Sequence, residues 1–93
     1  MTTLNNNQKK IQLVKVISKN LLFRGSADEL FNQIDNSDIS EIIIDFRQIQ
    51  TITRSFAQQY LKNKEQSKKK ILDVNIAPKI KKMFELIGKT NKS

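Results

Sequence analysis

The stretch EIIIDF, residues 41–46, is the strongest strand signal in the chain. Its three consecutive isoleucines predict burial on both faces, as in the central strand of a sheet that helices cover on each side. Asp45 stands near the end of this strand, where its carboxylate can accept hydrogen bonds from backbone N–H groups and fix the following turn. A small α/β domain would place such a strand at its centre.

Upstream of this strand the sequence predicts another strand and a helix. The β-branched run IQLVKVI predicts a strand over residues 11–17. Residues 20–24 (NLLFR) either continue that strand, pair with it or lead into the helix. Ser26 and Glu29 match a capping box at the helix start. The predicted helix ends near residue 36, and its apolar stripe consists of Ala27, Leu30, Phe31 and Ile34.

Downstream the sequence predicts helix, strand and helix. Thr53 can cap a helix that runs to about residue 67, with Phe56, Ala57, Tyr60 and Leu61 inward. Residues 71–76 alternate as a strand. Leu72, Val74 and Ile76 share one face and Asp73 and Asn75 share the other, which predicts a strand with one solvated or edge face. Pro78 fits the first turn of a last helix, and Gly88 fits its C-terminal cap. The last helix has an apolar stripe of Ile80, Met83, Phe84 and Ile87.

The resulting order, β-α-β-α-β-α, predicts a small α/β domain with a largely parallel sheet packed with helices. A hairpin partner from residues 20–24 would make the sheet mixed. We expect a disordered leader over residues 1–9, one domain over residues 10–88 and a polar tail over residues 89–93. Exposed strand edges could pair two copies, so the oligomeric state stays open.

The composition excludes many kinds of catalytic site. The 93 residues include no cysteine, no histidine and only two glycines, so Cys/His zinc sites, Ser-His-Asp triads and Gly-rich phosphate loops cannot form. We expect no enzymatic activity, no metal and no cofactor. Asp45 paired with a lysine or with Tyr60 is the acid–base pair that remains. No long apolar run or signal peptide is present, which indicates a cytoplasmic protein without a membrane partner.

The net charge of +8 is concentrated at the C-terminal end. Residues 61–93 contain ten lysines and three acidic residues. Such a lysine-rich segment is either a solvated surface, a contact for an acidic protein or a contact for nucleic acid. Weak, nonspecific nucleic-acid binding is therefore the alternative function. The predicted basic patch consists of Lys62, Lys64, Lys68, Lys69, Lys70, Lys79, Lys81 and Lys82.

Several short segments resemble the STAS-like family, small domains of unassigned function related to the STAS domains of anti-sigma factor antagonists. The resemblance covers about residues 10–90. Its motifs are LFRGSADEL at residues 22–30, IIIDFRQI at 42–49, ITRSFA at 52–57, and VNIAP at 74–78 followed by the last apolar helix. It implies a non-enzymatic regulatory module that binds a protein, such as a histidine-kinase-like ATPase or another regulator.

The resemblance and the residue types together select candidate site residues around the turn after the central strand. In the antagonists a serine at the start of the following helix is phosphorylated. Here Arg54 stands at that position and the next hydroxyl is Ser55. A phosphate on Ser55 would lie at the N-terminus of the helix, where free N–H groups favour an anion. The predicted partner-binding residues are Asp45, Phe46, Arg47, Thr53, Arg54 and Ser55, of which Ser55 and Thr53 are the candidate phosphorylation sites.

Overall fold

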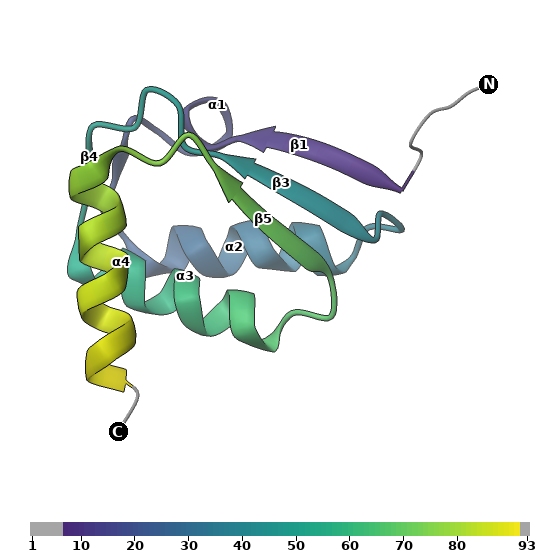
Figure 1. The fold of residues 1–93 in the computed structure, drawn as a ribbon. Coiled ribbons are helices and arrows are strands. Elements are labelled where there is room, and N and C mark those ends of the chain that lie inside the picture. The colour runs from purple at the N-terminus through teal and green to yellow at the C-terminus, as the bar shows by residue number, and fades with distance from the viewer. Residues whose placement is uncertain (1–6, 92–93) are drawn as a thin grey trace.

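The computed structural model describes residues 7–91, so the predicted leader residues 1–6 and tail residues 92–93 lie outside the described part. Its centre is a three-stranded sheet in the order β1-β3-β5, and all of its strands are parallel (Figure 1). The strands are β1 (Gln8–Gln12), β3 (Glu41–Asp45) and β5 (Lys70–Val74). The predicted α/β class and parallel sheet are therefore confirmed.

The residues from Asn20 onwards do not join the main sheet. β2 (Asn20–Leu21) pairs in parallel with β4 (Thr51–Ile52), and these four residues make a separate two-stranded sheet. No antiparallel hairpin partner makes the described sheet mixed. This short pairing holds the segment before the second helix against the segment before the third.

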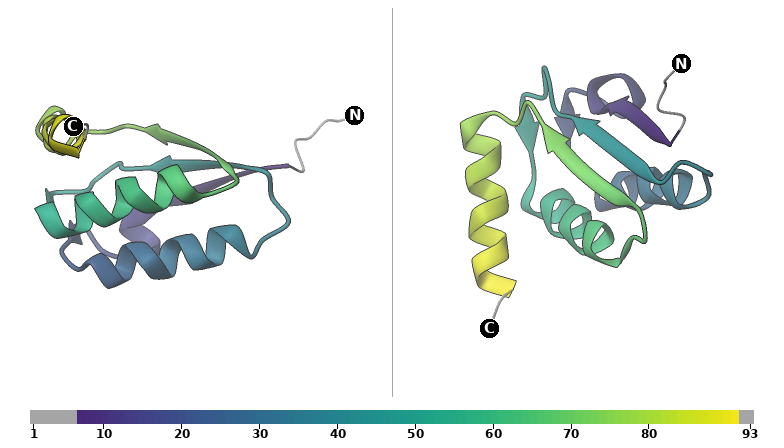
Figure 2. Two further views of the ribbon diagram at one scale, coloured as in Figure 1. Left: turned by 90° about the horizontal axis from the view of Figure 1, so that it is seen from below. Right: turned by 45° about the vertical axis from the view of Figure 1, so that its right-hand side comes forward.

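Four helices complete the described fold: α1 (Leu13–Val16), α2 (Arg24–Asp35), α3 (Arg54–Gln66) and α4 (Pro78–Asn91). Figures 1 and 2 show α2 and α3 side by side beneath the sheet, while α4 contacts α3 and runs across its direction. The core lies between the sheet and α2 and α3, and an aromatic cluster fills it. Phe31, Phe46, Phe56 and Phe84 all pack around the ring of Tyr60.

The central strand is where the sequence predicts it, but helices cover only one of its faces. Ile42 and Ile44 are buried beneath α2 and α3, whereas Ile43 on the opposite face is only partly buried. Connections between parallel strands are right-handed, and the order β1-β3-β5 advances in one direction. Both crossover helices therefore lie on the same face. Within residues 7–91 no helix lies across the other face (Figure 1), so the prediction of two covered faces is wrong.

The first strand begins and ends earlier than predicted. It pairs with β3 from Gln8, opposite Glu41, to Gln12, opposite Asp45. Beyond Gln12 the chain has no further strand to pair with, and Leu13 turns into the core as the first residue of α1. The predicted strand over residues 13–17 is therefore wrong. Gln8 and Lys9, predicted as leader, belong to β1.

The start of α2 also differs from its prediction. The helix begins at Arg24, with Phe23 as its N-cap and no side-chain cap. The Ser26 N–H donates to the Phe23 carbonyl oxygen at 3.0 Å, which places Ser26 within the first turn. The predicted capping box is therefore wrong. The apolar stripe and the helix end at Asn36 are confirmed.

The predicted faces of β5 are reversed in the structure. Asp73 pairs with Ile44 of β3 and therefore faces the helices, while Leu72 pairs with Ile43 and points away from them. Asp73 is satisfied there because the Tyr60 hydroxyl donates to it at 2.5 Å and Lys64 Nζ lies 2.7 Å away. Leu72, predicted on a buried face, is 39% exposed.

The last helix begins at Pro78 as predicted, and Ile80 and Ile87 are buried. It continues past Gly88 to Asn91, so Gly88 is not its cap and the predicted boundary at residue 88 is too early. No helix among residues 7–91 is long and apolar enough to cross a membrane.

Candidate functional site

The structure places the six predicted partner-binding residues in two groups. Asp45, Phe46 and Arg47 lie where β3 ends, and Thr53, Arg54 and Ser55 lie where α3 begins. Of the six, only the two arginines and Ser55 are exposed. In the first group Arg47 alone is exposed, and in the second group Arg54 and Ser55 are exposed while Thr53 is only partly so.

Asp45 is a buried carboxylate that holds the turn after β3. Its Oδ1 accepts hydrogen bonds of 2.9 Å from the Arg47 N–H and from Asn75 Nδ2. Its Oδ2 lies 3.5 Å from Lys10 Nζ and has no hydrogen-bond partner among the described residues. Burial raises the pKa of Asp45, but those two hydrogen bonds and the charges of Lys10 and Arg47 outweigh it and lower the pKa below its ordinary value. The predicted turn-fixing role is confirmed.

Phe46 is a core residue, so it has no exposed surface to offer a partner. Its ring packs edge-on against Tyr60 at 5.7 Å and against Phe84 at 5.8 Å. It follows Ile44 on the helix-facing side of the sheet, and this alternation buries it. Phe46 and the buried Asp45 are therefore structural residues, which corrects their prediction as partner contacts.

Thr53 ties the start of α3 to the segment that precedes α2. Its Oγ1 accepts from the Phe56 N–H at 3.1 Å, which caps α3 as predicted. The same hydroxyl donates to the Leu22 carbonyl oxygen at 2.8 Å, and the Thr53 N–H donates to the Leu21 carbonyl oxygen at 2.9 Å. The starts of α2 and α3 are thus held next to each other.

An exposed apolar and basic surface surrounds this junction. Phe23 is 70% exposed and Leu22 is 42% exposed. Arg24 begins α2, Arg54 begins α3, and both are exposed. We call these residues the helix-terminal surface: Leu22, Phe23, Arg24, Arg54 and Ser55.

Leu22, Phe23 and Arg24 were not among the predicted site residues. The available signal was that Leu22 and Phe23 lie outside the apolar stripe of α2, which begins at Ala27. A large apolar pair with no place in a predicted core stripe is a candidate for a contact with another molecule.

The lysines of the predicted basic patch lie on or next to three different elements of the structure, α3, β5 and α4. Lys68, Lys69 and Lys70 lie where β5 begins, while the lysines of α4 follow its end. Lys64 pairs with Asp73 at 2.7 Å, Lys69 donates to the Ser37 carbonyl oxygen at 2.7 Å, and Lys70 lies 3.9 Å from Glu41. The exposed members of the predicted patch are Lys62, Lys68, Lys70, Lys79, Lys81 and Lys82.

The remaining acid–base pair from the sequence does not form. Tyr60 bonds to Asp73 and not to Asp45. Burial, the Asp73 charge and the hydrogen bond to Asp73 together raise the pKa of Tyr60 well above its ordinary value. Tyr60 is fully buried, so its hydroxyl is a structural group.

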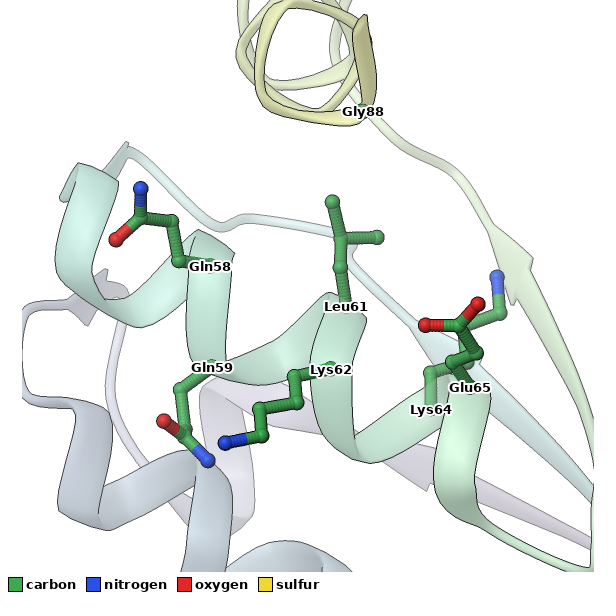
Figure 3. Close-up of a pocket in the computed structure, with 7 residues that line it drawn as sticks. All are labelled: Gln58, Gln59, Leu61, Lys62, Lys64, Glu65 and Gly88. Atoms are coloured by element: carbon green, nitrogen blue, oxygen red, sulfur yellow. The ribbon is translucent and has the colours of Figure 1, made fainter. Parts of the chain in front are cut away.

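A groove of about 730 Å³ lies between α3 and α4 (Figure 3). Leu61 points from α3 towards Gly88 of α4, whereas Gln59 and Lys62 point the other way. The lining therefore does not converge on a common point. Among residues 7–91 there is also no group of three or more side chains able to ligate a metal.

Comparison of the chain with models of known protein families, with curated proteins and with solved structures finds no match. The features that bear on function are therefore those of the surface itself. Of these, the helix-terminal surface combines the largest exposed aromatic side chain with two arginines and a hydroxyl at a helix start.

Proposed function

We propose that the chain is a non-enzymatic regulatory module that binds another protein through its helix-terminal surface. The single observation that carries this proposal is the 70% exposure of Phe23 beside the joined starts of α2 and α3. Aromatic and arginine side chains dominate the binding energy of protein interfaces. The chemistry of the surface fits a partner with an apolar pocket for Phe23 and carboxylates for Arg24 and Arg54.

The STAS-like resemblance supports the same region of the chain. It implies that the start of the helix after the central strand is the regulatory position and that the partner is a histidine-kinase-like ATPase or another regulator. In this chain α3 is that helix, with Ser55 as its second residue. The resemblance and the exposed surface thus point to the same place.

Of the two candidate hydroxyls, Ser55 is the better phosphorylation site. The Thr53 hydroxyl already makes two hydrogen bonds, so a phosphate there would break the cap and the link to Leu22. Ser55 is exposed and its hydroxyl has no hydrogen-bond partner among the described residues. A phosphate on Ser55 would neutralise positive charge beside Arg54 and weaken attraction for an acidic partner.

Copurification tests the proposal. The tagged chain is incubated with nuclease-treated extract of the cells that make it, and captured proteins are identified by mass spectrometry. Phe23→Ser and Arg54→Glu are compared with wild type and with Lys82→Gln, a control on an exposed position of α4. Serine favours the N-cap position that Phe23 occupies, so the first variant is expected to keep its fold.

We expect one acidic partner that wild type and Lys82→Gln retain and that both surface variants lose. Retention of the same partner by folded Phe23→Ser and Arg54→Glu would overturn the proposed surface. A parallel capture uses extract without nuclease treatment. If it recovers only nucleic acid, and lysine variants lose that nucleic acid, the alternative function is favoured and the protein-binding proposal is overturned.

A further inference from the structure

No helix of the described chain covers the face of the sheet opposite α2 and α3, although Asp45, at one end of this face opposite Val74, is buried where the Arg47 N–H and Asn75 bond to it. The strand register places Lys10, Ile43 and Leu72 next to one another across the middle of this face. Leu72 is 39% exposed, and Ile43 and Val74 are only partly buried. Parallel sheets almost always have both faces covered, so three apolar side chains on an open parallel face require an explanation.

The dimensions of this face match one helix. Its three strands lie about 4.8 Å apart, so the outer two are about 10 Å apart, and five residues extend about 16 Å. An α-helix with its side chains is about 10–12 Å wide, and about 11 residues extend 16 Å. One helix of three turns would therefore cover the face from end to end.

A second copy of the chain fits this face less well. The flat area of about 160 Å² is far below the roughly 800 Å² that each partner buries in a stable complex. The basic side chains at the edges of the face would also repel their copies in a symmetric pair. Area and charge both favour a helix that belongs to a larger partner and adds to other contacts of that partner.

The charges accessible at the edges of the face are positive. Lys70 is 70% exposed, while its partner Glu41 is only 27% exposed. Lys10 and Arg47 are likewise exposed above the buried Asp45. In each of these ion pairs the cation is the outer member, so an approaching segment meets three basic side chains.

We propose that this open sheet face binds one amphipathic helix of a partner protein, about three turns long, with acidic residues along its sides. The apolar stripe of that helix packs on Ile43, Leu72 and Val74. Its carboxylates pair with Lys10, Arg47 and Lys70. This surface lies on the sheet and shares no residue with the helix-terminal surface, so the two proposals can fail separately.

Site-specific photocrosslinking tests the inference. A benzoylphenylalanine replaces Leu72 in the full chain, which is irradiated in the cells that make it, and crosslinked peptides are sequenced by mass spectrometry. Benzoylphenylalanine in place of Lys82 measures the background level of crosslinking. Benzoylphenylalanine in place of Phe23 reports on partners of the helix-terminal surface. We expect the Leu72 position to crosslink one acidic segment with apolar residues at helical spacing.

A synthetic peptide of that crosslinked segment provides the quantitative test. The methyl signals of Ile43, Leu72 and Val74 are expected to shift on titration, and Leu72→Lys is expected to weaken binding at least tenfold. Lys70→Gln is expected to weaken binding severalfold and to reduce its salt dependence, while Lys82→Gln, at an exposed position of α4, leaves binding unchanged.

Three outcomes would overturn the inference: crosslinks from Leu72 only to a second copy of this chain, only to lipid, or only at the Lys82 background level. A crosslink from Phe23 together with any of these outcomes would leave the proposed function standing while this inference fails.

Discussion

The hydrogen bond between Tyr60 and Asp73 gives a sharp test of how β5 is placed. The Tyr60 hydroxyl donates to Asp73 Oδ1 at 2.5 Å, and the ring lies at the centre of the aromatic cluster. This contact exists only if Asp73 lies on the face of the sheet that α3 covers. The sequence predicts Asp73 on the opposite face. Tyr60→Phe removes the hydroxyl and keeps the ring.

The expected cost follows from the type of bond. A hydrogen bond from a buried hydroxyl to a carboxylate contributes about 1.5–3 kcal/mol. Lys64 still pairs with Asp73 after the substitution, so Asp73 keeps one partner. We expect Tyr60→Phe to lower the free energy of unfolding by about 2 kcal/mol, which for a domain of this size lowers Tm by about 10 °C.

The same substitution changes the alkaline pH dependence. The pKa of Tyr60 is raised in the folded state, so the unfolded chain loses its proton first as the pH rises. Stability from this group is fully present below about pH 10 and falls as the pH rises above that value. Tyr60→Phe is therefore expected to reduce the loss of stability between pH 10 and pH 11.

Urea unfolding of wild type, Tyr60→Phe, Asp73→Ala and the double variant measures the coupling between the two side chains. We expect a coupling energy of about 1.5 kcal/mol or more. A coupling near zero, together with an unchanged alkaline profile, would refute the placement of Asp73 against α3.

Three further predictions concern single residues. The lowered pKa of Asp45 means that its stabilising contribution is present above its ordinary value of 3.8 and is lost as the pH falls through the folded-state pKa. The free energy of unfolding should therefore fall less steeply with decreasing pH for Asp45→Asn than for wild type. Equal slopes for the two proteins would count against a buried, ionised Asp45 carboxylate. Thr53→Ala removes a helix cap and should cost about 1–2 kcal/mol in urea unfolding, whereas no cost would contradict the double role of its hydroxyl. Gly88 lies inside α4 with no atom within 4 Å of an added Cβ, so Gly88→Ala should raise the free energy of unfolding by about 0.5–1 kcal/mol and raise the urea midpoint accordingly. A lower midpoint would indicate that α4 ends before residue 88.

Local signals predicted the elements whose structure depends on nearby residues. The isoleucine run gave the central strand, apolar spacing gave the inner faces of α2, α3 and α4, and Thr53 marked the start of α3. Each of these features depends on residues within one or two turns of the chain. The local sequence is therefore enough to predict these features.

Features set by distant partners were not predictable in the same way. β1 ends at Gln12 because β3 ends opposite it, and Asp73 faces inward because the register places it beside Ile44. The alternating pattern of residues 71–76 marks two faces but does not say which one the helices cover. Tyr60 and Lys64 decide that point by providing partners for Asp73.

The candidate site shows the same division. Arg54 and Ser55 were found because a strand-to-helix turn can be located from sequence. Phe23 was not, because its exposure depends on the helix starting at Arg24 and on the link from Thr53 to Leu22. Phe46 was wrongly included because its alternation with Ile42 and Ile44 continues the buried face past the end of the strand.

The affinity of the purified partner for the Phe23→Ser variant tests the proposed protein-binding function most directly. Isothermal titration calorimetry compares this variant with wild type and with Lys82→Gln at one salt concentration. The proposal predicts that Kd rises at least tenfold for Phe23→Ser and is unchanged for Lys82→Gln. An unchanged Kd for a folded Phe23→Ser protein would contradict it.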